Sequence, residues 1–380
     1  MAEIEPFHVM ALLARARELE AQGRSIIHME IGEPDFPTPE PVLRAGIRAL
    51  EKGDLFYTPT PGLPELRRAI AGWYRSRYGV EVPASRVIVT TGSSAALMLA
   101  CAVLVDPGDE VLVADPGYPA NRHFVRVVEG VPRPVAVDAT SAYQLAPDHL
   151  EGSWGERTVA ALVASPSNPT GTLISTEQLA RMADIARARG GTLIVDEIYH
   201  GLVYEGECAT ALALSPDVFV INSFSKYFNM TGWRLGWMVA PEAYVAEIDR
   251  LAQNLYLAAP TPAQHAALAA FEPETLAILE GRRRELQARR DYLVPALRRL
   301  GFDIPVMPQG AFYVYAGCAQ LTRDSFGFAR DLLERAGVAI TPGVDFGANA
   351  PERHVRFAYT SPIDRLREGV ARIEAFVRRQ

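Results

Sequence analysis

The stretch Leu193-Ile194-Val195-Asp196-Glu197-Ile198-Tyr199 begins with a short, continuously apolar run and ends in polar side chains. A run of this length and composition favours a strand that is buried on both faces of a sheet. A similar run at residues 159–164 comes before it, and residues 177–189 between the two have a helical pattern. A strand, a helix and a second strand in this order are typical of a parallel crossover unit. The stretch therefore indicates an α/β fold.

Further short apolar runs continue this alternation in both directions along the chain. A helical pattern at about residues 94–104 separates two of them. The predicted strands are residues 87–90, 111–113, 159–164, 192–195, 218–221 and 235–239. We expect these strands to form one sheet with helices on both faces.

The composition changes near residue 273, where a stretch rich in Arg, Glu, Leu and Ala predicts one long amphipathic helix up to residue 300. The run Arg282-Arg283-Arg284 is expected on its solvated face. A strand at residues 311–315, a helix at 326–336 and a terminal helix from Ile363 follow. Residues 10–21 are helical in pattern, and a turn-rich linker comes after them. We predict a large domain at residues 41–270 and a smaller α+β domain formed by residues 1–40 and 271–380.

The overall composition excludes several classes of protein. The chain has 380 residues, of which 49% are apolar and 22% charged, as in ordinary globular proteins. A net charge of −7 argues against nucleic acid as a partner. The three cysteines and seven histidines show no metal-binding spacing, so no metal is expected. The apolar stretch at residues 95–105 is too short for a bilayer, and no signal peptide is evident, so a cytoplasmic location is expected.

Lys226 lies just past the predicted strand at residues 218–221, in Ser223-Phe224-Ser225-Lys226. Sheets of this kind bind ligands at the carboxyl ends of their strands. Burial there would lower the pKa of the lysine amine and make it a nucleophile. The two serine hydroxyls and the guanidinium of Arg234 could grip a phosphate. Taken alone, the segment also fits an ordinary surface loop.

Asp196 ends a predicted buried strand, where a carboxylate is costly unless it meets a cation. A protonated pyridine nitrogen is one such cation, and Tyr199 could reach the same ring. The alternative for Asp196 is a cap on the following helix. In Ser165-Pro166-Ser167-Asn168-Pro169-Thr170-Gly171, two prolines and a glycine predict a tight turn that holds the Asn168 amide as a hydrogen-bond donor. A purely structural turn is the alternative there.

Two more segments follow predicted strands. Thr91-Gly92-Ser93-Ser94 stands at a strand-to-helix junction, where free N–H groups bind phosphate. A simple serine cap fits this segment as well. Tyr118, in Asp115-Pro116-Gly117-Tyr118-Pro119, could stack on a flat ring or serve as a turn tyrosine.

In this order and at these spacings, the segments resemble the fold-type I aminotransferases of class I/II, which use pyridoxal 5'-phosphate (PLP). The resemblance covers nearly the whole chain, from Gly32-Glu33-Pro34-Asp35 through Tyr57-Thr58-Pro59 to Arg356. It implies a mainly parallel seven-stranded sheet sandwiched by helices in the large, PLP-binding domain. It also implies a ping-pong enzyme that moves an amino group from an L-amino acid to a 2-oxo acid, with 2-oxoglutarate as the expected acceptor.

The resemblance assigns a role to each residue around the cofactor. Lys226 is the Schiff-base lysine and moves the proton at the substrate Cα. Asp196 keeps the pyridine nitrogen protonated, and Asn168 and Tyr199 bond to the 3-oxygen of the ring. Tyr118 stacks on the ring. The residues implied at the phosphate are Ser93, Ser94, Ser223, Ser225 and Arg234.

Three positions far from these segments also match the family. Arg356 matches the arginine that binds the substrate α-carboxylate with two hydrogen bonds, a substrate site to which Asn168 also belongs. An edge-strand surface arginine is the alternative. Gly32 matches the glycine whose backbone lies near that carboxylate. Tyr57 matches a tyrosine that reaches the phosphate of the neighbouring subunit, so a homodimer is expected.

Two other functions share much of this pattern. A PLP-dependent C–S β-lyase uses the same core residues. A non-catalytic PLP-sensing regulator would need a DNA-binding domain, and only about 30 residues precede Gly32. The sequence does not identify the amino donor. No second cationic residue can be assigned to a side-chain carboxylate, because side-chain pockets are built from loops of both subunits. We expect a neutral or aromatic donor.

Overall fold

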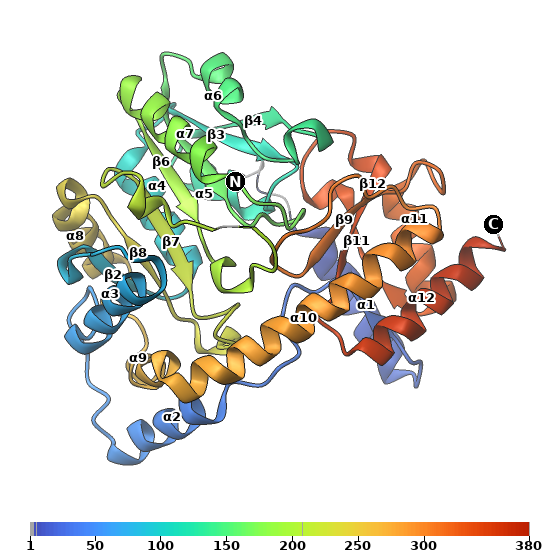
Figure 1. Cartoon of the computed structure of the whole chain (residues 1–380), viewed down its shortest axis with the longest axis horizontal. Helices are drawn as coiled ribbons and strands as arrows, with labels where there is room; N and C mark the ends of the chain where they lie inside the picture. The colour runs from blue at the N-terminus through green and yellow to red at the C-terminus, as the bar shows by residue number, and fades with distance from the viewer. Residues whose placement is uncertain (1–3, 5, 207, 380) are drawn as a thin grey trace.

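A seven-stranded sheet forms the centre of the protein in the computed structural model, which describes residues 4, 6–206 and 208–379 (Figure 1). The strand order is β2-β8-β7-β6-β5-β3-β4. All strands are parallel except β8, which runs antiparallel to β2 and β7. The strands are β2 (Val87–Thr90), β3 (Glu110–Asp115), β4 (Val131–Ala136), β5 (Thr158–Ala164), β6 (Thr192–Asp196), β7 (Phe219–Ser223) and β8 (Gly236–Val239).

Helices cover both faces of this sheet, as predicted. Alternate side chains of β5 enter two separate cores: Ala160 and Leu162 pack in one, and Ala161 and Val163 in the other. This alternation follows from the two-residue period of a strand. The helices around the sheet are α2 (Glu40–Lys52), α3 (Pro64–Tyr78), α4 (Ser93–Leu104), α5 (Pro119–Val127), α6 (Pro147–Ser153), α7 (Thr176–Ala188), α8 (Val245–Leu255) and α9 (Thr261–Leu268).

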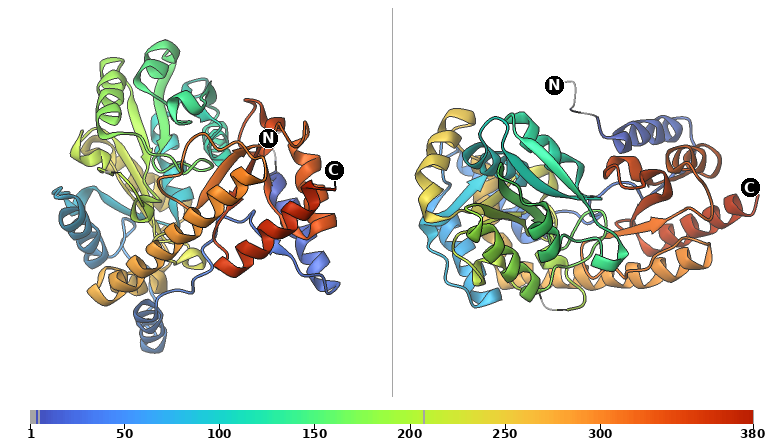
Figure 2. Two further views of the ribbon diagram at one scale, coloured as in Figure 1. Left: turned by 45° about the vertical axis from the view of Figure 1, so that its right-hand side comes forward. Right: turned by 90° about the horizontal axis from the view of Figure 1, so that it is seen from above.

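The two ends of the chain meet in a second group of elements. Strand β1 (Ile27–His28) pairs in parallel with β10 (Val338–Ala339). Next to them, β11 (Thr341–Pro342), β12 (His354–Ala358) and β9 (Tyr313–Gly317) form an antiparallel sheet. Figure 2 shows α1 beside the C-terminal elements, with α10 running from the large sheet to this group. The helices here are α1 (His8–Ala21), α10 (Pro273–Arg299), α11 (Ser325–Asp331) and α12 (Ile363–Val377). The domain boundaries at 40/41 and 270/271 stay a prediction.

Strand β4 had no counterpart among the strands predicted from the apolar runs. It lies at the edge of the sheet and its sequence, Val131-Pro132-Arg133-Pro134-Val135-Ala136, is largely exposed. Prolines are tolerated on an edge strand because one side of the strand needs no hydrogen-bond donor. Such a strand carries no apolar run that a sequence pattern could detect.

Two local predictions need correction. The strand expected at residues 311–315 starts only at Tyr313, because Ala311 has a φ of 58° and cannot continue an extended strand. The arginine run on α10 is not a simple solvated face. Arg282 donates to the Pro37 carbonyl at 2.6 Å, and Arg283 donates to the Val203 carbonyl at 3.2 Å. These bonds connect α10 to the segment before α2 and to the loop that contains Val203.

Candidate active site

A cavity of about 270 Å³ lies at the carboxyl edge of the large sheet, where the sheet meets the second group of elements, formed by both chain ends. This is where open α/β sheets bind ligands. Eleven of the thirteen predicted site residues line it, although they come from segments spread over most of the chain. They are Gly32, Ser93, Ser94, Tyr118, Asn168, Asp196, Tyr199, Ser225, Lys226, Arg234 and Arg356.

Lys226 follows the end of β7 by three residues, and this position carries its amine into the cavity. Its Nζ donates to the carbonyl of Gly32 at 2.8 Å. Burial lowers the pKa of Lys226 to about 8; Glu33 opposes this shift, and Arg356 acts in the same direction as burial. A lysine with this pKa has a substantial neutral fraction at physiological pH and can act as a nucleophile or a base.

Asp196 is the last residue of β6 and is 4% exposed. Its Oδ1 accepts a hydrogen bond from the Ile198 N–H at 3.1 Å. Burial raises the pKa of Asp196 to about 7, against the effects of that bond and of Lys226. Within the described chain, the carboxylate has no ion-pair partner within 4 Å. A buried carboxylate facing a cavity fits the protonated pyridine nitrogen of PLP, which would supply the missing cation.

The N-terminus of α4 and the guanidinium of Arg234 form the second part of a PLP site. Gly92, the N-cap of α4, has a φ of 78°, and a Cβ there would lie 2.9 Å from Nη2 of Arg234. A glycine is therefore needed for the arginine to approach the first turn of the helix. Free N–H groups, two serine hydroxyls and a guanidinium then face one space, a donor set that suits a phosphate.

Two predicted residues do not reach the cavity. Ser223 was expected at the phosphate, but its hydroxyl accepts from the Ser225 N–H at 3.0 Å and points to the Leu235 carbonyl at 3.4 Å. Its hydroxyl therefore shapes the loop before Lys226, and the assignment of Ser223 to the phosphate stays a prediction. Tyr57 is 84% exposed and lies outside the cavity of its own chain.

Arg356 closes the opposite side of the cavity and is 6% exposed. Its Nη1 donates to Oδ1 of Asn168 at 2.9 Å, and its Nη2 donates to the Glu30 carbonyl at 2.5 Å and to Thr341 at 3.1 Å. The rings of Tyr313 and Phe346 lie 4.3 and 5.0 Å from the guanidinium carbon. This arrangement excludes the surface alternative for Arg356 and holds a cation ready for a carboxylate.

No role was predicted for Tyr313, which lies between the two sides of the cavity. Its hydroxyl is 3.0 Å from that of Tyr199, and its ring packs on Arg356. A Cβ on Gly32 would overlap the Tyr313 hydroxyl, so the glycine leaves room for this tyrosine. The predicted strand at 311–315 contained Tyr313, but its partners Tyr199 and Arg356 come from distant segments that no local pattern indicates.

Several apolar residues from distant segments complete the cavity wall. Phe7, Val9 and Met10 come from the start of the chain, and Phe346 from a loop near its end. Asp345 joins these two segments, because its carboxylate accepts from the N–H groups of His8 and Val9 at 2.7 and 2.9 Å. No sequence pattern marks these contacts, since they depend on loops that meet only in the fold.

Comparisons with known proteins agree with this geometry. The family described as aminotransferase class I and II matches residues 24–373. The (5-formylfuran-3-yl)methyl phosphate transaminase of Methanocaldococcus jannaschii is 37% identical over 380 residues, covering 99% of this chain and 98% of the relative. The valine–pyruvate aminotransferase of Mycobacterium tuberculosis is 39% identical over 385 residues, covering 99% and 97%.

Solved structures show the same fold. The crystal structure of an aminotransferase from Mycobacterium tuberculosis has a TM-score of 0.96 at 37% identity, covering 100% of this chain and 98% of that one. The similarity extends over both groups of elements, and it confirms the predicted fold class. The chain therefore belongs to the class I and II aminotransferases and is a PLP-dependent transaminase.

Proposed function

We propose that this enzyme transfers an amino group from a neutral or aromatic L-amino acid to 2-oxoglutarate by a ping-pong mechanism. The observation that carries the proposal is that the Lys226 amine lines one cavity together with a buried arginine, Arg356, and a buried aspartate, Asp196. The cavity of about 270 Å³ is small for two substrates at once, and this suits an enzyme that releases its first product before it binds the second substrate.

When bound, PLP supplies a protonated ring that takes up the electron pair released as the substrate Cα loses its proton. Asp196 holds the proton on the ring nitrogen. Lys226 has the pKa of a base that can take the Cα proton at Nζ and return it elsewhere. Arg356 and Asn168 would orient the substrate through its α-carboxylate in the cavity that the Lys226 amine also lines. Tyr199 would donate to the 3-oxygen of the bound cofactor.

The lining of the cavity supports a neutral donor. Among the described residues that line it, the cationic side chains are Lys226, Arg234 and Arg356, and each already has one of the roles above. The rest of the wall is largely apolar, with Phe7, Met10 and Phe346 among it. A second carboxylate on the donor would meet no further cation among these described lining residues, and the second carboxylate of 2-oxoglutarate would have to be bound by groups outside them, such as those of the partner subunit. The named substrates of the two relatives differ from each other, so the family alone does not choose the donor.

An exposed apolar surface supports a homodimer. Phe56 and Tyr57 are 78% and 84% exposed, and Ile47 and Leu50 on the neighbouring helix α2 are 53% and 58% exposed. Large exposed apolar groups in one region are typical of an interface. In the proposed dimer, Tyr57 of the partner subunit donates to the cofactor phosphate. Analytical ultracentrifugation should show a dimer. Tyr57→Phe should weaken PLP binding and leave the dimer intact.

Within the described residues, no helix combines the length and the apolar character needed to cross a membrane. The cytoplasmic location stays a prediction.

The experiment that tests the function is an absorbance spectrum of the PLP-loaded protein before and after adding single amino acids without an oxo acid. We expect the visible band to convert to that of the pyridoxamine form, fastest with neutral or aromatic donors. Addition of 2-oxoglutarate should restore the first band. Conversion by aspartate alone would contradict the donor class. Release of pyruvate and ammonia from a β-substituted amino acid, without band conversion, would favour the lyase.

A further inference from the structure

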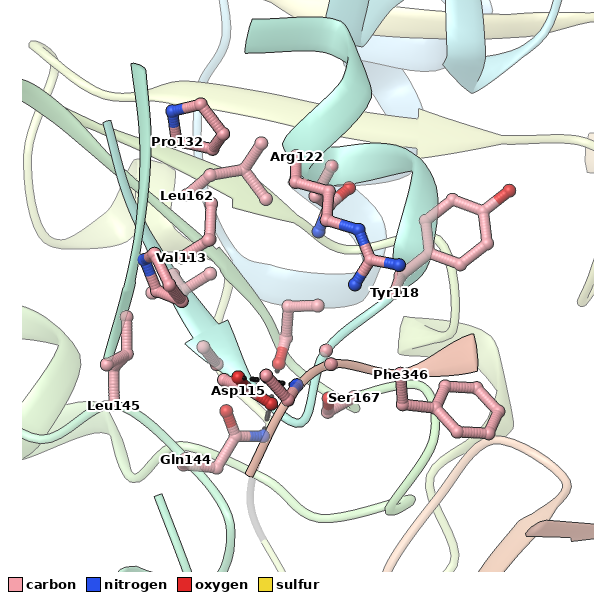
Figure 3. A pocket seen from close by; sticks show the side chains of 18 of the residues that line it. Val113, Asp115, Tyr118, Arg122, Pro132, Gln144, Leu145, Leu162, Ser167 and Phe346 are labelled. Carbon is pink, nitrogen blue, oxygen red and sulfur yellow. Dashed lines mark hydrogen bonds between the residues drawn. The ribbon is translucent and has the colours of Figure 1, made fainter. Parts of the chain in front are cut away.

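A second cavity, of about 540 Å³, opens beside the active site at the same edge of the sheet (Figure 3). It is formed by the ends of β3 and β5, the edge strand β4, helix α5 and the loop at residues 344–348. Tyr118, Ala164 and Phe346 line both cavities and make up their common wall. None of the roles proposed above uses this second space, although its volume is in the range of small-molecule sites.

The floor and sides of the second cavity are mostly apolar. Val113, Leu145 and Leu162 are at most 6% exposed and come from three different segments. Pro132 and Pro134 of β4 also line the cavity, and Figure 3 shows Pro132 and Phe346 on opposite sides of it. An apolar or aromatic body would replace water against these side chains and gain from their burial.

A cation extends into this apolar space. Arg122 reaches from α5 towards the strand end that carries Asp115 (Figure 3). Within the described residues, its one hydrogen bond is a long contact of 3.5 Å from Nη2 to the Asp345 carbonyl. Asp115 does not neutralise it through a bond, since that carboxylate accepts from the Ala348 and Asn349 N–H groups at 2.9 and 3.3 Å. Most of the donor capacity of the guanidinium therefore remains for a ligand.

Hydrogen-bond acceptors line the same space. Asn121, the neighbour of Arg122 on α5, is 7% exposed, and its Oδ1 has no partner within the described chain. Gln144 donates from Nε2 to the Ala164 and Thr172 carbonyls at 3.1 and 2.8 Å, which leaves its Oε1 as an acceptor. Buried polar atoms are normally satisfied, so this set favours a ligand that also carries a donor.

We propose that the second cavity is a binding site for an aromatic or apolar carboxylic acid that carries a hydroxyl or amino donor. Arg122 binds the carboxylate, the apolar walls enclose the body, and the acceptors Asn121 and Gln144 face the donor. The site is distinct from the α-carboxylate site, since Arg356 does not line the second cavity and Arg122 does not line the first. Substitution of Arg356 or of Arg122 therefore removes the carboxylate partner of one site and leaves that of the other, so binding to the two sites can be measured separately.

Calorimetric titration of the PLP-loaded protein with phenyllactate tests this site, because phenyllactate has a carboxylate, a hydroxyl and an aromatic ring but no amino group to transfer. In Arg356→Ala, where the active-site arginine is gone, we expect one equivalent to bind per chain. Adding Arg122→Ala should weaken that binding at least about tenfold, as expected for loss of a charge-assisted pair. Arg181→Ala, an exposed arginine on α7, is the matched control and should change nothing.

A second variant removes the space and keeps the charge. Pro134→Trp places a large side chain at an exposed position of the edge strand that lines the cavity. Introduced into the Arg356→Ala protein, it should abolish the binding of phenyllactate. The PLP absorbance band shows that each variant is folded and loaded, independently of any transamination. No binding to Arg356→Ala, or binding that is insensitive to Arg122→Ala, would overturn the proposal. Binding that needs both arginines in the otherwise intact protein would also overturn it, since it would indicate one composite site.

Discussion

The two sides of the active site are built in different ways. On the cofactor side, Asp196, Lys226 and the N-terminus of α4 each follow the end of a strand in one sheet. On the carboxylate side, Arg356 is held by the carbonyl of Glu30, 326 positions away, and by Asn168, 188 positions away. The first side depends on local strand–loop geometry. The second depends on how the two chain ends pack against the sheet, so substitutions on the two sides should have different signatures.

Lys226→Ala should have the largest effect. We expect kcat to fall at least about 10⁴-fold, because both the nucleophile and the base are lost. The visible band of the loaded protein should also lose its dependence on pH, whereas circular dichroism should remain unchanged. Lys226→Arg is the matched control, since it keeps the positive charge. A kcat within tenfold of the parent for Lys226→Ala would refute the role of this lysine.

Asp196→Asn should lower kcat by about 10²–10³-fold, as loss of one preorganised electrostatic partner does elsewhere. Although the substitution lowers kcat, it should raise the stability of the folded protein at high pH. Between pH 4 and about 7, folded Asp196 holds a proton that the unfolded chain has released, so stability falls as pH rises through this window. At pH 8, PLP-free Asp196→Asn should therefore be more stable than its parent by up to about 4 kcal/mol. Equal denaturation midpoints at pH 8 would show that this carboxylate carries no such cost.

Arg356→Ala tests the carboxylate side. We expect kcat/KM to fall about 10²-fold, mainly through KM, because a charged pair with the substrate is lost. The affinity for PLP should stay within about twofold, since Arg356 faces the substrate and not the phosphate. If the affinity for PLP also fell about 10²-fold, the two sides of the active site would not be independent.

Tyr313→Phe should have the smallest effect and would show how the two sides are connected. Loss of one hydrogen bond to Tyr199 should lower kcat about three- to tenfold. The pH midpoint of the visible band should also move, because Tyr199 is the expected partner of the 3-oxygen. Tyr315→Phe, on the same strand but outside the cavity, is the control. An unchanged pH midpoint in Tyr313→Phe would limit this tyrosine to packing on Arg356.

Most of the cofactor side was predictable from the sequence. Short apolar runs located β5, β6 and β7, and polar residues directly after these runs must lie at one edge of a parallel sheet. Ser223 is the last residue of β7 rather than part of the loop after it, and its hydroxyl accepts from the Ser225 N–H. The apolar run placed the end of β7 two residues too early, because the strand continues into the polar residues Asn222 and Ser223.

The sequence by itself determined the α/β alternation, the lysine and aspartate at the strand ends, and the resemblance that singled out Arg356. Tertiary structure alone decided the partners of Arg356, the place of Tyr313 between the two sides, and the cavity that contains Arg122. The physical reason is the distance along the chain over which each effect acts. Strand periodicity and loop position act over a few residues, whereas these contacts join segments that come together only when the chain ends pack on the sheet.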